Sequence, residues 1–112
     1  MTSKSMREVV SFDALVSKSD GYGNHVSDYE PRFEERAHFK FLRGGERVIG
    51  ARLEGIQPTV VTIWRSPDTE AIQTSWRMKD LLSGTIYAIR SKIPTDDQLY
   101  FELTCESGDI DG

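Results

Sequence analysis

The residue types that can do chemistry are few in this chain of 112 residues, and they are widely spaced. Residues 45–52 have the outline of a phosphate-binding loop, but Ala51 and Arg52 stand where such a loop needs a Lys and a Ser or Thr to contact phosphate and magnesium. His25 and His38 lie too far apart to suggest a local pair of metal ligands, and one cysteine gives a zinc site little support. We therefore expect neither phosphate-loop nor zinc chemistry.

The remaining reactive side chains also favour ordinary structural roles. Cys105 falls on the apolar face of an expected strand, where a thiol behaves as a small buried hydrophobe, and a single cysteine cannot form an internal disulfide. Asp96 with Asp97, and Asp109 with Asp111, have the composition of an acid pair or a calcium site, but turns and chain ends are the usual places for such residues. The sequence predicts no enzyme, no metal site and no cofactor.

Aromatic side chains leave a nucleic-acid function open. In a small oligonucleotide-binding barrel, aromatic residues on the strands stack on bases beside basic residues. The aromatic residues suited to this role are Tyr22, Tyr29, Trp64 and Tyr100. Aromatic residues at alternate strand positions are more often part of a core or a subunit interface, so both interpretations stand at this point.

Charge is distributed unevenly along the chain, although the net charge is only −4. Six of the 14 basic residues lie between positions 32 and 52, whereas residues 93–112 carry six acidic residues and no basic ones. This pattern fits two solvated faces, or unlike surfaces that meet head to tail between subunits or stacked rings. The first residues lack the apolar core of a signal peptide, and no apolar run is long enough to span a membrane, so we expect no membrane partner.

A β-hairpin over residues 75–90 is the clearest structural signal. Trp76 and Met78 alternate with basic residues before a Ser-Gly turn, and Tyr87 and Ile89 alternate after it. This period of two is typical of a half-buried sheet. The hairpin predicts a scaffold rather than a catalytic site.

The first part of the chain predicts three further strands. An apolar face over residues 10–16 precedes a glycine-rich turn at residues 20–24. A polar second strand over residues 25–34 contains Pro31, which lacks a backbone donor, so we expect an edge strand or a bulge there. A third strand over residues 36–42 points Phe39 and Phe41 to one face.

The rest of the chain predicts one long loop between further strands. Residues 43–56 contain four glycines and fit no strand, and a loop of this length in a compact domain is usually functional or disordered. A strand at residues 59–65, a short helical turn at 68–72, a strand at 99–105 and a flexible acidic tail at 106–112 follow.

Together these elements predict a single all-β domain over residues 1–112. We expect a small barrel or sandwich of about six or seven antiparallel strands, with one long loop and one short helical turn. The expected core consists of Phe12, Phe39, Phe41, Trp76, Met78, Tyr87, Ile89, Phe101 and Leu103.

The order of these features resembles a known family. A short strand begins near Arg7, the turn at residues 20–24 follows, and a Gly/Arg loop comes after the third strand. The hairpin then supplies the remaining positions, which are Arg77, Gly84, Tyr87 and Ile89. Over residues 7–105 this pattern resembles the head-closure proteins of long-tailed bacteriophages and gene transfer particles, which are also called head-tail joining or stopper proteins.

The resemblance implies a structural role in a virion or phage-like particle. Such proteins form a ring beneath the portal and adaptor, retain packaged DNA in the head and provide the platform on which the tail docks. The implied partners are further copies of the chain in a hexamer or dodecamer, the portal or adaptor ring, a tail-terminator or tail tube protein, and packaged double-stranded DNA in non-specific contact. Assembly would take place in the bacterial cytoplasm, and no reaction is catalysed.

The resemblance also assigns the long loop to the axial channel. The candidate channel-loop residues are Arg43, Gly44, Gly45, Glu46, Arg47, Val48, Ile49, Gly50, Ala51, Arg52 and Leu53. Its arginines suit contacts to phosphate without sequence readout, or ordinary solvation and pairing with neighbouring glutamates. An adaptor or tail-terminator role, and a small oligonucleotide-binding barrel, remain the alternatives.

Overall fold

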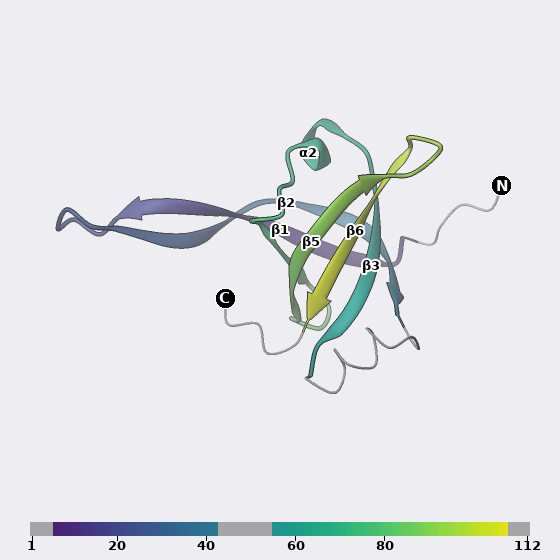
Figure 1. Cartoon of the computed structure of the whole chain (residues 1–112), viewed down its shortest axis with the longest axis horizontal. Coiled ribbons are helices and arrows are strands. Elements are labelled where there is room, and N and C mark those ends of the chain that lie inside the picture. Colours follow the sequence, from purple (N-terminus) through teal and green to yellow (C-terminus); the bar gives the residue numbers. More distant parts are fainter. Residues whose placement is uncertain (1–5, 43–54, 108–112) are drawn as a thin grey trace.

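The computed structural model describes residues 6–42 and 55–107, and within these residues the chain forms six strands and one short helix (Figure 1). The elements are β1 (Glu8–Ser19), β2 (His25–Phe41), β3 (Gln57–Trp64), α2 (Pro67–Glu70), β4 (Arg77–Asp80), β5 (Ile86–Pro94) and β6 (Tyr100–Ser107). All pairings between strands are antiparallel, and the order β1-β2-β3-β6-β5-β4 closes into a barrel because β4 pairs with β1. The expected all-β fold is confirmed, and of the two architectures considered the chain adopts the barrel.

The barrel core contains most of the apolar residues that the alternation predicts. Phe12, Met78, Tyr87, Ile89, Phe101 and Leu103 are buried. Phe39 and Trp76 are partly buried and pack against this core. Burial of this connected apolar surface is the main force that stabilises the closed sheet.

Phe41 is an exception, and its assignment to the core is wrong. Its side chain is 48% exposed, although it shares a strand face with Phe39. Phe41 is the last residue of β2 and pairs with Thr59 near the start of β3, so it lies at the end of the barrel. Its ring meets the ring of Phe39 edge-on, with the centroids 6.1 Å apart, and this contact leaves the outer side of the ring in solvent.

The second and third expected strands are one continuous strand of 17 residues, β2. The expected boundary between two strands near Glu35 is therefore wrong, because β1 pairs with β2 on both sides of Glu35. The expected irregularity at Pro31 is confirmed. Phe12 pairs with Phe33 and Asp13 pairs with Pro31, which leaves Arg32 as an extra residue in a bulge.

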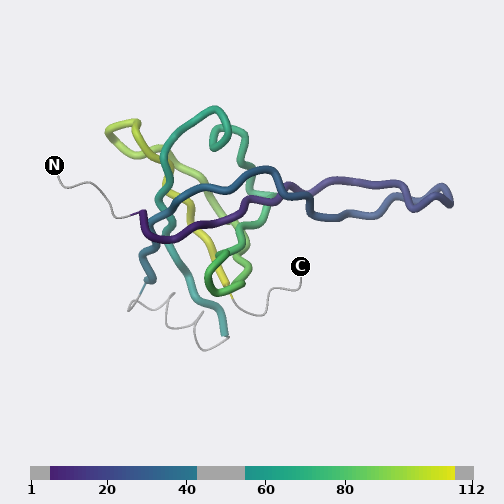
Figure 2. The backbone as a smooth tube through the Cα atoms, turned by 180° about the vertical axis from the view of Figure 1, so that it is seen from behind, coloured from purple at the N-terminus to yellow at the C-terminus, as the bar shows by residue number. Residues whose placement is uncertain are grey.

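The paired ends of β1 and β2 project from the barrel as a two-stranded arm (Figures 1 and 2). We define the arm as residues 14–30. β4 pairs with β1 through Val10–Asp13, and β3 pairs with β2 through His38–Phe41, so both of these pairings lie outside the arm. Gly21 and Gly23 have positive φ in the turn at its tip, as the sequence predicts. The sequence predicts this hairpin but not its extension beyond the core.

The last strand and the long loop complete the comparison with the expected elements. Glu106 and Ser107 belong to β6, so the expected tail does not begin at residue 106. Glu106 pairs with Ala88, and its carboxylate accepts a hydrogen bond from Arg90 at 2.9 Å. Residues 108–112, and residues 43–54 of the candidate channel loop, lie outside the described part of the chain.

Candidate functional site

The base of the arm is fastened to the barrel by a polar cluster on its outer surface. Nε of Arg77, on β4, donates to Oδ2 of Asp13 at 3.0 Å, and Oγ of Ser11 donates to Oδ1 of Asp13 at 2.9 Å. The Asp13 side chain is only 7% exposed, so these two donors replace the water that it loses on folding. The guanidinium of Arg77 also lies over the ring of Tyr29, 4.3 Å from its centroid.

The surface of the arm combines exposed apolar residues with acidic residues. Leu15, Tyr22 and Val26 are exposed, and Tyr22 at the tip is 89% exposed. The charged residues along the arm are Lys18, Asp20, Asp28 and Glu30. Nζ of Lys18 lies 3.9 Å from Asp28 and 3.5 Å from Glu30, in ion pairs that water screens.

The tip of the arm is ordered by Asp20. Its Oδ1 accepts hydrogen bonds from the backbone N–H of Tyr22 at 2.7 Å and of Asn24 at 3.3 Å. The hydrogen bond from Tyr22 is the main cause that lowers the pKa of the Asp20 carboxyl, because it favours the charged form. Asp20 thus shapes the turn that presents the Tyr22 side chain.

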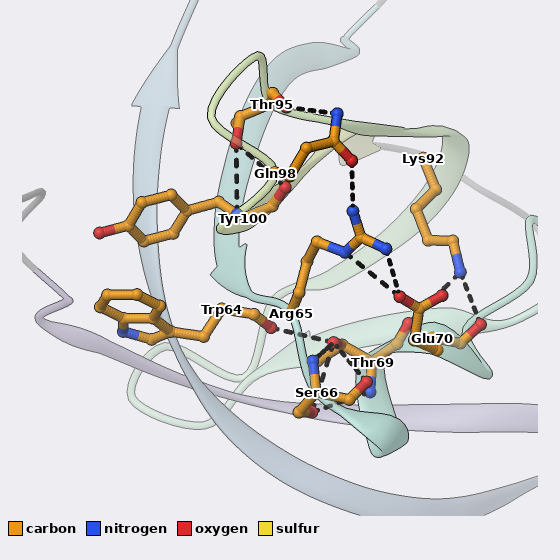
Figure 3. A network of polar contacts seen from close by, with 9 residues as sticks. All are labelled: Trp64, Arg65, Ser66, Thr69, Glu70, Lys92, Thr95, Gln98 and Tyr100. Atoms are coloured by element: carbon orange, nitrogen blue, oxygen red, sulfur yellow. Dashed lines mark hydrogen bonds and ion pairs between the residues drawn. The ribbon is translucent and has the colours of Figure 1, made fainter.

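A polar network ties the end of the barrel beside α2 together (Figure 3). Ser66 caps α2, and its backbone N–H donates to Oγ1 of Thr69 at 2.7 Å while its side chain accepts from the Thr69 N–H at 3.2 Å. Arg65 donates to Glu70 and to Gln98, each at 2.7 Å. Nζ of Lys92 donates to the backbone oxygen of Glu70 at 2.8 Å. These contacts join β3, α2 and the β5–β6 turn.

Aromatic side chains at this end are packed together rather than arranged for stacking on bases. Tyr100 is buried beneath Trp64, whose ring centroid is 4.3 Å away, and Trp64 itself is 44% exposed. Tyr29 lies against Arg77 at the base of the arm, and Tyr22 lies in the turn at its tip, between Gly21 and Gly23. The four aromatic residues of the oligonucleotide-binding interpretation therefore do not form one platform.

The opposite end of the barrel anchors both ends of the long loop. The N–H of Leu42 donates to the backbone oxygen of Pro58 at 3.1 Å, and Nε2 of Gln57 donates to the backbone oxygen of Leu42 at 3.2 Å. The chain therefore leaves the barrel after β2 and returns before β3 at adjacent points. We call this the loop end. Exposed apolar side chains are also found here, from Phe41, Leu81, Leu82 and Ile86.

The one cysteine of the chain lies inside the barrel. Cys105 is buried, as expected, and burial raises the pKa of its thiol to about 12. Across residues 6–42 and 55–107, no group of three or more His, Cys, Asp or Glu side chains is placed to hold a metal ion. No helix in the described residues is long and apolar enough to cross a membrane.

Comparison with protein families identifies the family of this chain. The family of phage head completion proteins matches residues 1–108. The chain belongs to this family. Head completion proteins are structural proteins, so this head completion protein is a component of the virion of a phage or phage-like particle and acts in the connection between head and tail.

Solved structures share the fold of this head completion protein at low sequence identity. Protein SF1141 from Shigella flexneri 2a, determined in solution, has a TM-score of 0.74 and 18% identity, with 97% of this chain and 98% of that chain covered. A chain in the virion of a native gene transfer agent particle has a TM-score of 0.62 and 18% identity, with 91% and 96% covered. No curated protein matches the sequence. The resemblance to head-closure proteins is thus confirmed at the level of the family.

The candidate residues from the sequence are divided between two places. The core residues lie in the barrel wall, with Phe41 at its end, and the channel-loop residues lie outside the described residues. The arm and its anchor were missed as a functional feature. One signal was present in the sequence, because residues 25–31 of the second strand are mostly polar and contain only one aliphatic side chain, Val26, that could join a barrel core.

Proposed function

We propose that this head completion protein forms a ring between the portal or adaptor and the tail, closes the filled head and provides the platform for tail docking. The family match over residues 1–108 carries this proposal. A closed barrel suits the role, because pairing of β1 with β4 leaves a compact wall that several copies can place side by side.

The position of the residues that flank the long loop supports a role in closing the channel. Both ends of the loop are held at the loop end of the barrel by the contacts among Leu42, Gln57 and Pro58. A loop fastened in this way can change its course without altering the barrel. In a ring, symmetric copies of residues 43–54 would meet at the axis, where Arg43, Arg47 and Arg52 contact DNA phosphates without reading the sequence.

Deletion of residues 45–54 tests this function. Arg43 and Gly44 then connect directly to Gly55, and the adjacent loop ends predict a barrel that still folds. We expect the purified variant to keep the circular dichroism spectrum of the wild type. Its free energy of unfolding in urea should stay within about 1 kcal/mol of the wild-type value. Particles assembled with it should still join heads to tails but should lose packaged DNA when tails are absent.

Two measurements decide the result. Nuclease protection of DNA in tailless heads reports closure, and electron microscopy of the neck reports the ring. A matched variant with Arg43, Arg47 and Arg52 changed to Gln keeps the loop length and separates phosphate contact from physical obstruction. Normal DNA retention by heads with the deletion would reject the loop as the closure. Particles whose neck contains no ring of this chain would reject the connector itself.

A further inference from the structure

We propose that the arm of one subunit docks on the outer surface of β2 in a second copy of this chain, so that each arm links neighbouring subunits head to tail. The proposal rests on the ring proposed above and names the contact that holds it together. The receiving surface consists of the exposed side chains of Arg32, Arg36 and Lys40.

The arm lacks the packing that stabilises the barrel. A two-stranded hairpin alone is marginal in water, and a projecting one needs either a partner or local support. Leu15 and Val26 are 40% and 49% exposed, and Tyr22 is almost fully exposed at the tip. An exposed tyrosine at the tip of a long projection is a suitable anchor for a protein interface, because its ring buries a large area at little cost in side-chain entropy.

Charge identifies a second copy as the partner. The arm carries three acidic residues, Asp20, Asp28 and Glu30, beside one lysine. The outer surface of β2 within the barrel carries three basic residues and one acidic residue, Glu34. The arm and the barrel part of β2 thus carry charge of opposite sign, and opposite charge steers and aligns protein partners.

The outer part of the arm and the barrel part of β2 lie too far apart to neutralise each other within one subunit, although Glu30 and Arg32, where the two surfaces meet, are only two residues or about 7 Å of strand apart. Asp28 and Arg36 are eight residues apart on β2, which is about 26 Å of extended strand. This separation exceeds the Debye length of about 8 Å at physiological salt, so the charges are screened from each other. The arm also points away from the barrel (Figure 2). Contact of Asp28 with Arg36 or Lys40 therefore requires another copy. A contact between two different patches generates a ring when the rotation closes.

The anchor at the base of the arm prepares it for this contact. The hydrogen bond from Arg77 to Asp13 and the stacking of Arg77 on Tyr29 join both arm strands to β4. An arm held in one direction before binding loses less conformational entropy when it docks. The anchor thus lowers the entropic cost of the contact.

Charge reversal tests the proposal. The arm variant carries Asp28→Lys and Glu30→Lys, and the surface variant carries Arg32→Glu and Arg36→Glu. Each variant alone places like charges against each other and should lower incorporation into the neck of particles, or self-association of the purified chain at low salt, at least tenfold. Mixing the two variants should restore assembly, because each arm then meets an opposite surface on the other variant. Asp96→Lys and Lys79→Glu, at exposed positions outside both surfaces, are the controls.

The readouts are the number of copies in the neck by electron microscopy and the mass of the purified chain by sedimentation velocity. Recovery in the mixture, with unchanged controls, supports the arm contact. Wild-type assembly by either single variant, or failure of the mixture to recover, overturns it. A wild-type chain that is absent from the neck would instead reject the proposed connector, so the two failures are distinguishable. A benzophenone amino acid in place of Tyr22 gives a second reading, because its crosslink must fall on another copy of this chain.

Discussion

The guanidinium of Arg77 lies 4.3 Å from the ring centroid of Tyr29, although the two residues are on different strands and 48 positions apart. This stacking joins β4 to the β2 side of the arm. Because Arg77 also donates to Asp13 on β1, one side chain holds both strands of the arm to the barrel. The direction of the arm therefore depends on Arg77. This residue lies in the hairpin over residues 75–90, which is the element that the sequence predicts most clearly.

Substitution of Arg77 by Ala should destabilise the protein by about 1–3 kcal/mol, because it leaves the nearly buried Asp13 carboxylate with fewer hydrogen bonds. Urea denaturation followed by circular dichroism measures this change. Arg90→Ala is the matched control, since it removes a more exposed pair with Glu106 and should cost less than about 1 kcal/mol. Equal losses in the two variants would contradict a structural role for the arm anchor.

Truncation to Ala should lower the free energy of unfolding by different amounts at Phe39 and Phe41, although the two residues share one face of β2. Phe39 packs edge-on against Tyr87, with the ring centroids 5.6 Å apart, and Phe39→Ala should cost about 2–3 kcal/mol. The exposed Phe41 should cost less than about 1 kcal/mol when changed to Ala. Thermal or urea unfolding of both variants tests this order. A larger loss at Phe41 would mean that its ring is buried in the free chain.

Thr69→Val should destabilise the barrel by about 1–2 kcal/mol at nearly constant side-chain volume. Thr69 is fully buried, and its hydroxyl accepts from the Ser66 N–H and donates to the backbone oxygen of Trp64 at 2.9 Å. Valine fills the same space but leaves both backbone groups without this partner. Thr85→Val, in the exposed β4–β5 turn, is the comparison. Urea midpoints that fall equally for both variants would count against the capping contact.

Cys105 should make stability fall at alkaline pH. Burial raises its pKa to about 12, from an ordinary value of 9.0. Between these values the unfolded chain releases a proton that the folded chain keeps, so the free energy of unfolding decreases by up to about 1.4 kcal/mol per pH unit. Below the ordinary pKa this contribution to stability is fully present. Cys105→Ala should decline less steeply when urea unfolding is repeated from about pH 8 to about pH 10.5.

Thiol labelling tests the burial of Cys105 directly. In the folded protein Cys105 should resist a thiol reagent, because the reactive thiolate is scarce and the side chain is covered. Complete labelling should follow the addition of denaturant. Rapid labelling of the folded chain would show that the end of β6 opens readily.

Local pattern predicted the barrel wall well. Met78 and Tyr87 face each other across β4 and β5, where the alternation of the hairpin places them, and the short helical turn expected at residues 68–72 is present as α2 at Pro67–Glu70. These outcomes depend on neighbours in sequence or on a period of two. Such signals need no knowledge of distant segments.

The arm and its anchor depend on distant contacts, and the sequence pattern does not contain them. Whether Leu15 is covered depends on where β4 stops pairing with β1, which is at Asp13. The contact between Arg77 and Tyr29 depends on closure of the barrel. Phe41 was placed in the core for the same reason, since its alternation continues beyond the point where neighbouring strands can cover it.

The extra residue at Arg32 allows the arm to change in length without a change in the barrel. Before the bulge Tyr29 shares a face with Asp13, and after it Phe33 shares a face with Phe12, so the parity of β2 changes at this one position. Insertions in the arm should therefore be accepted in steps of two residues on each strand, or about 7 Å of added length. A single inserted residue on one strand would exchange the faces of the arm. A virion could thus adjust the span between its parts while the barrel sequence stays the same.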